Sequence, residues 1–453
     1  MNFLRIGLLI LISVGYLAGC VQNQAYRNTA SVDEPCKYTS MNTCPTAAIT
    51  VAKASNKYHL AFIEYDDQGF LHNPKQKNDV MDFFRKRVNE GPEKEVLMMT
   101  YIHGWHHNAR GDVEDSDIIE FRTLLQQAAN TYKNKEVLGL YIGWRGRVIE
   151  TPLDNVTFYS RKDTAHEIGQ NGITEELLEL EQIVKGFPVT KNKNLMITIG
   201  HSFGGAALFS SIREVLSQRL IQTRAFGSSS EAAGFGDLVV LLNPAFEGLR
   251  YQSIFELSQD GCRSYPDSQL PKLVTLSTPS DFPVRHMFTW GRYPVTMLES
   301  HRSPKSTECK HVGDKESSYT VNQWAGDRIA LGHFKPYMTH ILRKTARPQT
   351  EFEAFFGVAS NIFSEEVSEL KEAPQAFDKT ADAWISKMKA KDTTLLFGKN
   401  LILSSEGKTL PFNPYMNIFT QDDIMDGHNG IWTPEVKSFV QELVQITATK
   451  SVK

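Results

Sequence analysis

Residues 195–211 read LMITIGHSFGGAALFSS. The apolar run at 195–199 is followed by GHSFG at 200–204 and then by small and apolar residues, a pattern that predicts a strand, a sharp turn and a helix in that order. Glycines on both sides of Ser202 leave room for the turn, which raises the serine hydroxyl above the end of the strand. The first amides of the helix have no partner within the helix, so they are suited to stabilise negative charge beside that hydroxyl. We therefore interpret Ser202 as a nucleophile.

Length and composition limit the class of protein. The 453 residues, of which 41% are hydrophobic, are enough to bury a full core, either as one large domain with insertions or as two domains. The net charge is only −3, and the lysine-rich stretch at 185–193 is short. Nothing in these values indicates a nucleic-acid partner, and we expect none. The sequence has no internal repeats, which argues against a solenoid.

The first 20 residues have the features of an export signal. Arg5 precedes an apolar run at 6–17, which is too short to span a bilayer comfortably, so residues 1–19 are predicted to be a signal peptide. The sequence LAGC ending at Cys20 resembles the lipobox of bacterial lipoproteins. That resemblance implies cleavage before Cys20, acylation of this cysteine, and anchoring in the bacterial cell envelope, at the outer membrane if the host is Gram-negative. The alternative is an ordinary signal peptide with a fortuitous cysteine.

Export changes the interpretation of the remaining cysteines. Cys36, Cys44, Cys262 and Cys309 form an even set, and disulfides are favoured in an oxidising compartment. Three pairings are possible, and proximity in the sequence favours Cys36 with Cys44 and Cys262 with Cys309. Free buried thiols are the alternative. Because residues 20–56 are otherwise polar, we expect them to form a lipidated tether that contains a small stapled turn.

The rest of the chain alternates between apolar runs and helical patterns. Strands are predicted at 58–65, 95–102, 137–144, 195–199, 238–242, 273–277 and 415–420. Helices are predicted at 80–88 with an Asn78 cap, at 117–132, at 174–184, and after a Thr433 cap with Pro434 in the first helical position. This alternation predicts an α/β domain over 57–450 with a mainly parallel sheet covered by helices on both faces.

A long segment interrupts that alternation. We expect an insertion at about 284–412 that is helical, with two amphipathic segments at 352–388. Aromatic residues at helical spacing there suggest either a cap over an acyl pocket or packing against the core.

A nucleophilic serine needs a base and an acid that orients the base. Asp281 and His428 each follow a predicted strand, and the order serine, acid, histidine is that of α/β-hydrolases. His428 precedes the last helix, which suits a general base. Glu247, one strand earlier than Asp281, is the alternative acid, whereas Asp426 is too close to His428 in the sequence.

The loop HGWHHNA at 103–109 follows the strand predicted at 95–102. We expect the backbone amides of Phe203 and Trp105 to form the oxyanion hole. The histidines of this loop lack the spacing of a helical zinc motif, so we expect a hydrogen-bonded rim and no metal.

Six motifs together resemble a bacterial and fungal branch of the serine α/β-hydrolases. They are HGWHHNA at 103–109, LYIGWRG at 140–146, IGHSFGG at 199–205, LLNPAFE at 241–247, STPSD at 277–281 and DGHNGIW at 426–432. The resemblance covers about 58–447 and is weakest across the insertion. It implies an esterase or lipase without a cofactor, with Ser202, Asp281 and His428 as the triad. The gap between Asp281 and His428 is larger than in the simplest members of the family.

The substrate is therefore expected to be an acyl ester or a lipid. One alternative is a catalytically inactive surface lipoprotein that uses the same fold to bind a partner. Another is an acyltransferase or amidase that uses the same triad, since pocket shape and water access select the acceptor. The sequence does not define the oligomeric state.

Overall fold

The computed structural model describes residues 21–40, 43–53, 56–90, 95–113, 115–149, 157–186, 193–225, 230–259, 265–308, 317–345, 381–389, 394–397, 400–406, 409–410 and 412–449. The predicted signal peptide at 1–19, Cys20, Cys262, Cys309 and most of the amphipathic segment at 352–388 lie outside these residues. The chain forms two compact units, and we describe each by itself: the first is 1–216 with 235–246, the second 217–234 with 247–453.

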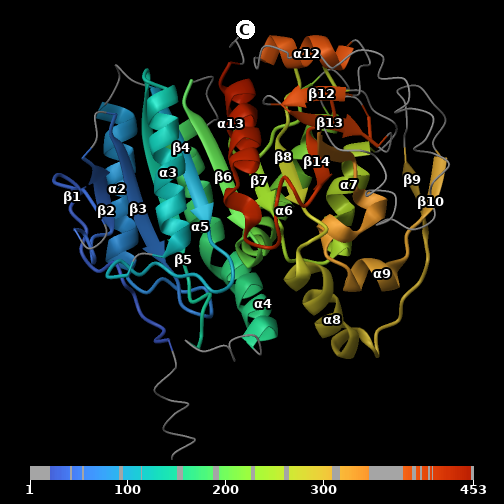
Figure 1. Ribbon diagram of the computed structural model, residues 1–453, viewed down its shortest axis with the longest axis horizontal. Helices are drawn as coiled ribbons and strands as arrows, with labels where there is room; N and C mark the ends of the chain where they lie inside the picture. The colour runs from blue at the N-terminus through green and yellow to red at the C-terminus, as the bar shows by residue number, and fades with distance from the viewer. Residues whose placement is uncertain are drawn as a thin grey trace, which may run out of the picture. The chain divides into compact units, whose positions relative to one another are not determined.

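The first unit is built on a mostly parallel sheet (Figure 1). Its strands are β1 (Cys36–Tyr38), β2 (Ile49–Ala52), β3 (Tyr58–Glu64), β4 (Glu95–Ile102), β5 (Lys135–Gly143), β6 (Leu195–His201) and β7 (Leu238–Leu242). They lie in the order β1-β2-β3-β5-β4-β6-β7, and every pair is parallel except β2 with β3. Its helices are α2 (Pro74–Glu90), α3 (Ser116–Thr131), α4 (Phe158–Glu167) and α5 (Ile173–Lys185), and α6 (Phe203–Ala225) begins there.

The central strands of this unit are nearly continuous buried apolar runs, as expected for a parallel sheet covered on both faces. Their carboxyl ends are in register, because Ile102 of β4 lies opposite Ile142 of β5 and Gly200 of β6. His201 of β6 likewise lies opposite Leu242 of β7. The loops that follow these strands therefore leave the sheet at the same level.

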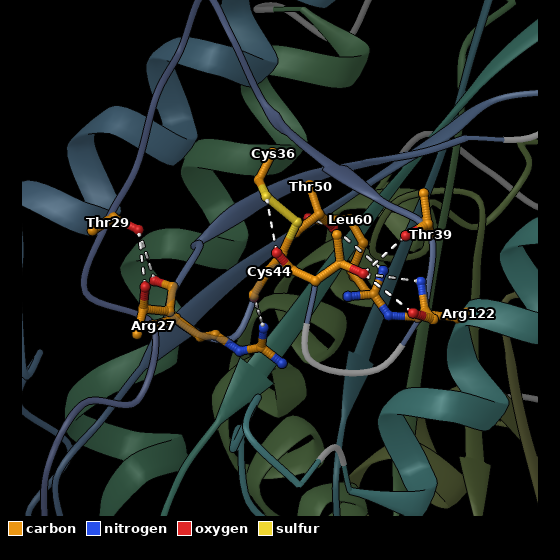
Figure 2. The surroundings of a disulfide bond; sticks show 11 residues. Arg27, Thr29, Cys36, Thr39, Cys44, Thr50, Leu60 and Arg122 are labelled. Carbon is orange, nitrogen blue, oxygen red and sulfur yellow. Dashed lines mark hydrogen bonds between the residues drawn. A yellow bond between two sulfur atoms is a disulfide. The ribbon is translucent and has the colours of Figure 1, made fainter.

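The expectation of a tether at 20–56 is wrong for its described part, because residues 21–40 and 43–53 pack into the first unit. The Arg27 side chain is buried, and its nitrogens donate to the carbonyls of Ala109 at 2.8 Å and Cys44 at 2.9 Å. Figure 2 shows Arg27 beside the disulfide between Cys36 and Cys44, which confirms that predicted pair. The polar composition of this segment suggested exposure to solvent. A guanidinium can nevertheless be buried when carbonyl oxygens accept hydrogen bonds from its N–H groups.

The start of α2 also differs from the prediction. Asn73 caps this helix, with its side-chain oxygen accepting from the Gln76 amide at 3.2 Å, so the prediction of an Asn78 cap is wrong. Pro74 occupies the first helical position, where its missing N–H costs nothing, and this explains the earlier start. The last helix begins as predicted, with Thr433 as the cap and Pro434 next.

The second unit contains a smaller mixed sheet (Figure 1). Its strands are β8 (Leu273–Ser277), β11 (His340–Lys344), β12 (Thr394–Phe397), β13 (Leu401–Ser405) and β14 (Tyr415–Thr420), with a separate hairpin of β9 (Lys305–Glu308) and β10 (Ser317–Thr320). The order is β8-β14-β11-β13-β12, parallel as far as β11 and antiparallel beyond it. Its helices are α7 (Gln252–Gln259), α8 (Phe288–Thr296), α9 (Gln323–Arg328), α12 (Ala381–Lys389) and α13 (Pro434–Ala448).

The insertion at 284–412 is not purely helical where it is described. β11 joins the sheet in parallel with β14, and β13 and β12 extend it. Each of these strands mixes apolar with polar or charged residues (HILRK, TLLF and LILSS), so none forms the continuous apolar run that marks a buried strand in the sequence. Among the described residues, no helix is both long and apolar enough to cross a membrane.

Candidate active site

The turn at Ser202 connects β6 to α6 in the first unit. Ser202 has φ = 55°, a left-handed conformation that is unfavourable for a residue with a side chain. Three backbone hydrogen bonds hold it: its amide donates to Leu242 at 3.0 Å, and its carbonyl accepts from Ala245 and Ala206, each at 3.1 Å. The predicted strand, turn and helix are confirmed, and the serine is the strained residue between them.

Glycines make this turn possible. A β-carbon at Gly204 would overlap the carbonyl oxygens of Ile102 and His103. A β-carbon at Gly104 would lie 2.8 Å from Cβ of Ser202, so the loop after β4 passes directly against the serine. The glycines of the two motifs therefore allow the β4 loop and the serine turn to meet.

Strained residues gather at this edge of the sheet. Within the part of the chain that the structure describes, four residues other than glycine have positive φ. Three of them, His106, Ser202 and Asn243, follow the neighbouring strands β4, β6 and β7. Backbone strain of this kind costs about 1–3 kcal/mol per residue and clusters at functional sites.

His103 fixes the backbone of the β4 loop. Its Nε2 accepts from the Trp144 amide at 3.0 Å, so Nδ1 carries the proton and donates to the Gly104 carbonyl at 2.9 Å. The Trp144 indole donates to the His103 carbonyl at 2.9 Å, and the two rings stack at 5.4 Å. Burial lowers the pKa of His103 to about 4, which keeps the imidazole neutral as this network requires.

His107 in the same loop is charged instead. Its Nδ1 lies 2.7 Å from Asp115 and its Nε2 lies 3.7 Å from Asp117, which also accepts from Tyr101 at 2.6 Å. Burial alone would lower the pKa of His107, but the charges of Asp117 and Asp115 and the hydrogen bond to Asp115 together raise it to about 9. The sequence suggested a hydrogen-bonded rim here, and it gave no sign of this ion pair.

The two residues expected to form the oxyanion hole both lie in the first unit. Phe203 is the first residue of α6, so its amide is among those that a helix leaves without an acceptor. Trp105 is buried against Phe158, with ring centroids 5.1 Å apart, and its indole donates to Thr157 at 3.4 Å. Packing thus fixes the side chain of Trp105, and its backbone remains in the loop that touches Ser202.

In the second unit, the structure brings Asp281 and His428 together. Nδ1 of His428 lies 2.9 Å from both carboxylate oxygens of Asp281, and the Val284 amide donates to the same carboxylate at 2.9 Å. Asp281 is fully buried, whereas the His428 side chain is 11% exposed. With its proton on Nδ1, the imidazole has its lone pair on Nε2, the tautomer that a general base needs.

Further hydrogen bonds join the loops that carry this pair. Ser280 Oγ accepts from the Gly427 amide at 2.8 Å, and Asp422 accepts from the Ser280 amide at 3.1 Å and the Thr278 hydroxyl at 3.2 Å. The loops follow β8 and β14, which pair in parallel, and so they leave the same edge of the sheet. These contacts depend on residues far apart in the sequence, and the sequence analysis did not find them.

Glu247, the alternative acid, has other partners. Its carboxylate pairs with Nε of Arg250 at 2.6 Å and with Nε of Arg292 at 3.2 Å. The geometry in the second unit therefore favours Asp281 over Glu247 as the partner of the histidine.

Two groups of side chains in the described residues have the ligand types of a metal site. They are His107 with Asp115 and Asp117, and Glu299 with His301 and Asp327. In the first group, Nδ1 of His107 lies 2.7 Å from Asp115, and Asp117 accepts from the Tyr101 hydroxyl at 2.6 Å. The second group is satisfied internally, since Asp327 pairs with Arg292 at 2.7 Å and His301 at 3.1 Å.

Comparisons with known proteins show little beyond this geometry. No protein-family model matches the chain, and no curated protein sequence matches it. Among solved structures, a phospholipase, PlaB from Legionella pneumophila in complex with thio-NAD, matches at 12% identity with a TM-score of 0.20. The match covers 55% of this chain and 46% of the phospholipase, and so less than half the length of that protein. A likeness this weak carries no argument about activity, and the class that the structure defines is an α/β protein with a mostly parallel sheet flanked by helices.

Proposed function

We propose that the protein is a serine hydrolase that cleaves carboxylic esters. In this proposal Ser202 is the nucleophile, His428 the general base and Asp281 the acid that orients it. The observation that carries the proposal is the strained turn at Ser202, where a serine with positive φ lies between a buried parallel strand and the first turn of a helix. The hydrogen bond between His428 and Asp281 supports the assignment of the other two roles.

The proposed reaction follows from these roles. Ser202 Oγ attacks the acyl carbonyl carbon while its proton passes to Nε2 of His428, and Asp281 stabilises the resulting imidazolium. The amides of Phe203 and Trp105 donate to the oxyanion. The C–O bond to the alcohol then breaks, the alcohol takes the proton from His428, and the acyl group stays on the serine. Water then gives a proton to His428 and attacks the acyl carbon, the bond from this carbon to Ser202 Oγ breaks, and Oγ takes the proton back from His428 as the carboxylic acid leaves. The mechanism requires that His428 reach Ser202 when the proton moves.

We also propose that the enzyme is held in the bacterial cell envelope by a lipid on Cys20. Several acyl chains on one residue would anchor it stably. A substrate that is itself a lipid would then be present at a high local concentration.

The first experiment measures ester hydrolysis by the full chain. p-Nitrophenyl esters of increasing acyl length are compared for the wild type, Ser202→Ala and Ser211→Ala, with fluorophosphonate labelling alongside. Ser211 is a buried serine of the same helix whose hydroxyl donates to Leu208 at 2.8 Å, and it serves as the matched control.

We expect turnover and labelling in the wild type and in Ser211→Ala, and neither in Ser202→Ala. A folded wild-type protein that is not labelled and hydrolyses no ester would contradict the proposal and favour a binding protein.

A further inference from the structure

An unusual apolar surface lies on the second unit, around α8 and α9. We call it the aromatic patch; it consists of Phe282, Trp290, Tyr293, Val295, Met297, Leu298 and Trp324. Four of its side chains are more than half exposed by a clear margin: Trp290 at 57%, Val295 at 63%, Met297 at 72% and Leu298 at 93%. Of the twelve exposed large apolar side chains in the described part of the chain, these seven come from residues 282–324. Isolated exposed apolar residues are ordinary, but a concentration of this kind marks an interaction site.

Helical spacing places most of the patch on one face. Phe282, His286, Trp290, Tyr293 and Met297 follow one another at intervals of four, four, three and four residues. A different face already packs inside the unit. Its buried members are Val284, Phe288 and Thr296. The segment therefore has two apolar faces, and packing of the unit uses one of them.

The exposed rings are held in fixed positions. Phe282 contacts Trp290 with ring centroids 5.9 Å apart, and Tyr293 of α8 contacts Trp324 of α9 with ring centroids 5.6 Å apart. The buried guanidinium of Arg328 lies 4.4 Å from the Trp324 ring and supports it. A preformed surface loses little conformational entropy when a partner covers it.

Basic residues border the patch. Arg285 lies one turn from Phe282, and the exposed residues Arg302 and Lys305 follow α8. The Arg302 amide donates to the Gln323 side chain at 2.9 Å, which brings this residue next to Trp324. Of the nearby acids, Asp327 is neutralised by Arg292 and His301, Asp422 interacts with Arg285, and Glu299 is exposed. The border therefore has an excess of positive charge, although the whole chain has a net charge of −3.

We propose that the aromatic patch binds the surface of an anionic lipid bilayer. Tryptophan and tyrosine prefer the headgroup region, Met297 and Leu298 would enter the acyl boundary, and Arg285, Arg302 and Lys305 would lie at the anionic headgroups. This contact is separate from the proposed lipid on Cys20, and it does not depend on the proposed chemistry of Ser202.

The test uses the fluorescence of the two exposed tryptophans as a local probe. The parent is the full chain with Cys20→Ser, which removes the predicted lipidation site. It is mixed with two kinds of vesicle, one of phosphatidylcholine alone and one of phosphatidylcholine with phosphatidylglycerol. Both kinds contain brominated acyl chains. We expect the anionic vesicles to quench the tryptophan fluorescence. The double variant Trp290→Phe with Trp324→Phe should lose this quenching while the protein still binds the vesicles. Quenching by the bromines reports contact at this patch whatever residues 1–19 contribute.

Two further variants separate the apolar and the charged contributions. Met297→Ser with Leu298→Ser should lower partition at the patch by about 100-fold, since both side chains leave water on binding. Arg302→Gln with Lys305→Gln should lower it by about 25-fold on anionic vesicles, at roughly fivefold per basic residue, and leave neutral vesicles unaffected. Ile221→Ser, which changes an apolar side chain that is 55% exposed outside the patch, is the control and should change nothing.

Three results would overturn the proposal. One is the absence of quenching in the parent chain, and another is quenching that persists without Trp290 and Trp324. The third is a parent chain that does not bind lipid but self-associates with rising concentration in sedimentation, while the variant Met297→Ser with Leu298→Ser does not self-associate. A second copy of this chain would then be the partner of the patch. Circular dichroism checks that the variants remain folded, which we expect because the changed side chains are exposed.

Discussion

The serine turn and the loops that carry Asp281 and His428 are held in place by different means. Backbone hydrogen bonds and glycines define the turn, where Ser202 keeps a strained φ between β6 and α6. Side chains define the loops, through the contact of His428 with Asp281 and the contacts of Ser280 and Asp422. The turn depends on the absence of β-carbons at its glycines, whereas the loops depend on particular side chains that lie about 150 positions apart in the sequence. The two regions should therefore respond differently to mutation.

The largest effect should come from removing the proposed nucleophile. Ser202→Ala should lower kcat by about 100,000-fold, because the remaining groups can bind an ester but cannot form the acyl-enzyme. Stopped assays with p-nitrophenyl esters and active-site labelling measure the loss. A fall of less than tenfold would show that another group performs the chemistry.

Replacing the acid tests the second region. Asp281→Asn should lower kcat by about 10,000-fold, since an amide does not hold His428 in the required tautomer or stabilise its charge. Glu247→Gln is the matched comparison: it should leave kcat of the folded protein nearly unchanged but lower Tm, because two arginines lose their buried partner. The opposite pattern would make Glu247 the acid.

A single methyl group should damage the turn. Gly204→Ala places a β-carbon against the carbonyl oxygens of Ile102 and His103, which are backbone atoms and cannot move independently, so we expect a loss of about 4 kcal/mol in the free energy of unfolding. Urea denaturation measures it. Gly205→Ala, whose β-carbon would lie 3.1 Å from Cβ of Pro244, should cost much less. Equal effects would show that the turn tolerates a shift of its backbone.

The ion pair beside the turn should make stability depend on pH. The pKa of His107 is about 9 in the folded protein and about 6.5 when unfolded, so its contribution is complete below pH 6.5 and is lost as the pH rises through 9. A shift of this size corresponds to about 3 kcal/mol. Thermal unfolding between pH 6 and pH 10 should show the decline, and His107→Gln should flatten it. An unchanged slope in that variant would assign the decline to other groups.

The smallest effect concerns the hydrogen bonds between the loops. Ser280→Ala removes the acceptor of the Gly427 amide and should lower kcat by about tenfold with little change in KM, since one hydrogen bond positions His428 indirectly. Ser280→Thr keeps the hydroxyl and should restore most of the activity. If both variants behave alike, the hydroxyl does not position the histidine.

The sequence predicted the parts of the fold that are locally encoded. The bounds of β7 and β8 agree with the prediction, because each is a short apolar run between turn residues. The strand, turn and helix around Ser202 were also predictable, since glycines flank the serine. The pairing of Cys36 with Cys44 followed from their proximity.

Features that depend on tertiary contacts could not be predicted. β11 joins the sheet only through its pairing with β14 and β13, and Arg27 is buried only because distant carbonyls accept hydrogen bonds from its guanidinium. The charge of His107 likewise depends on Asp115 and Asp117, which follow in another element. In each case the structure or charge of a residue depends on a contact with a residue elsewhere in the sequence, and the residue's own type does not predict it.

If Cys20 carries the proposed lipid, the packed N-terminal segment limits how far the protein can move from the bilayer. An unfolded tether from residue 20 to residue 56 would span about 120 Å when fully extended. Instead the Val21 amide donates to the Val148 carbonyl at 2.7 Å, and Arg145 donates to the Val21 carbonyl at 3.2 Å. Only about one residue, or roughly 4 Å of chain, would then separate a lipid on Cys20 from the folded protein. A protein held this closely would stay at the membrane surface, and its substrates would have to reach it there.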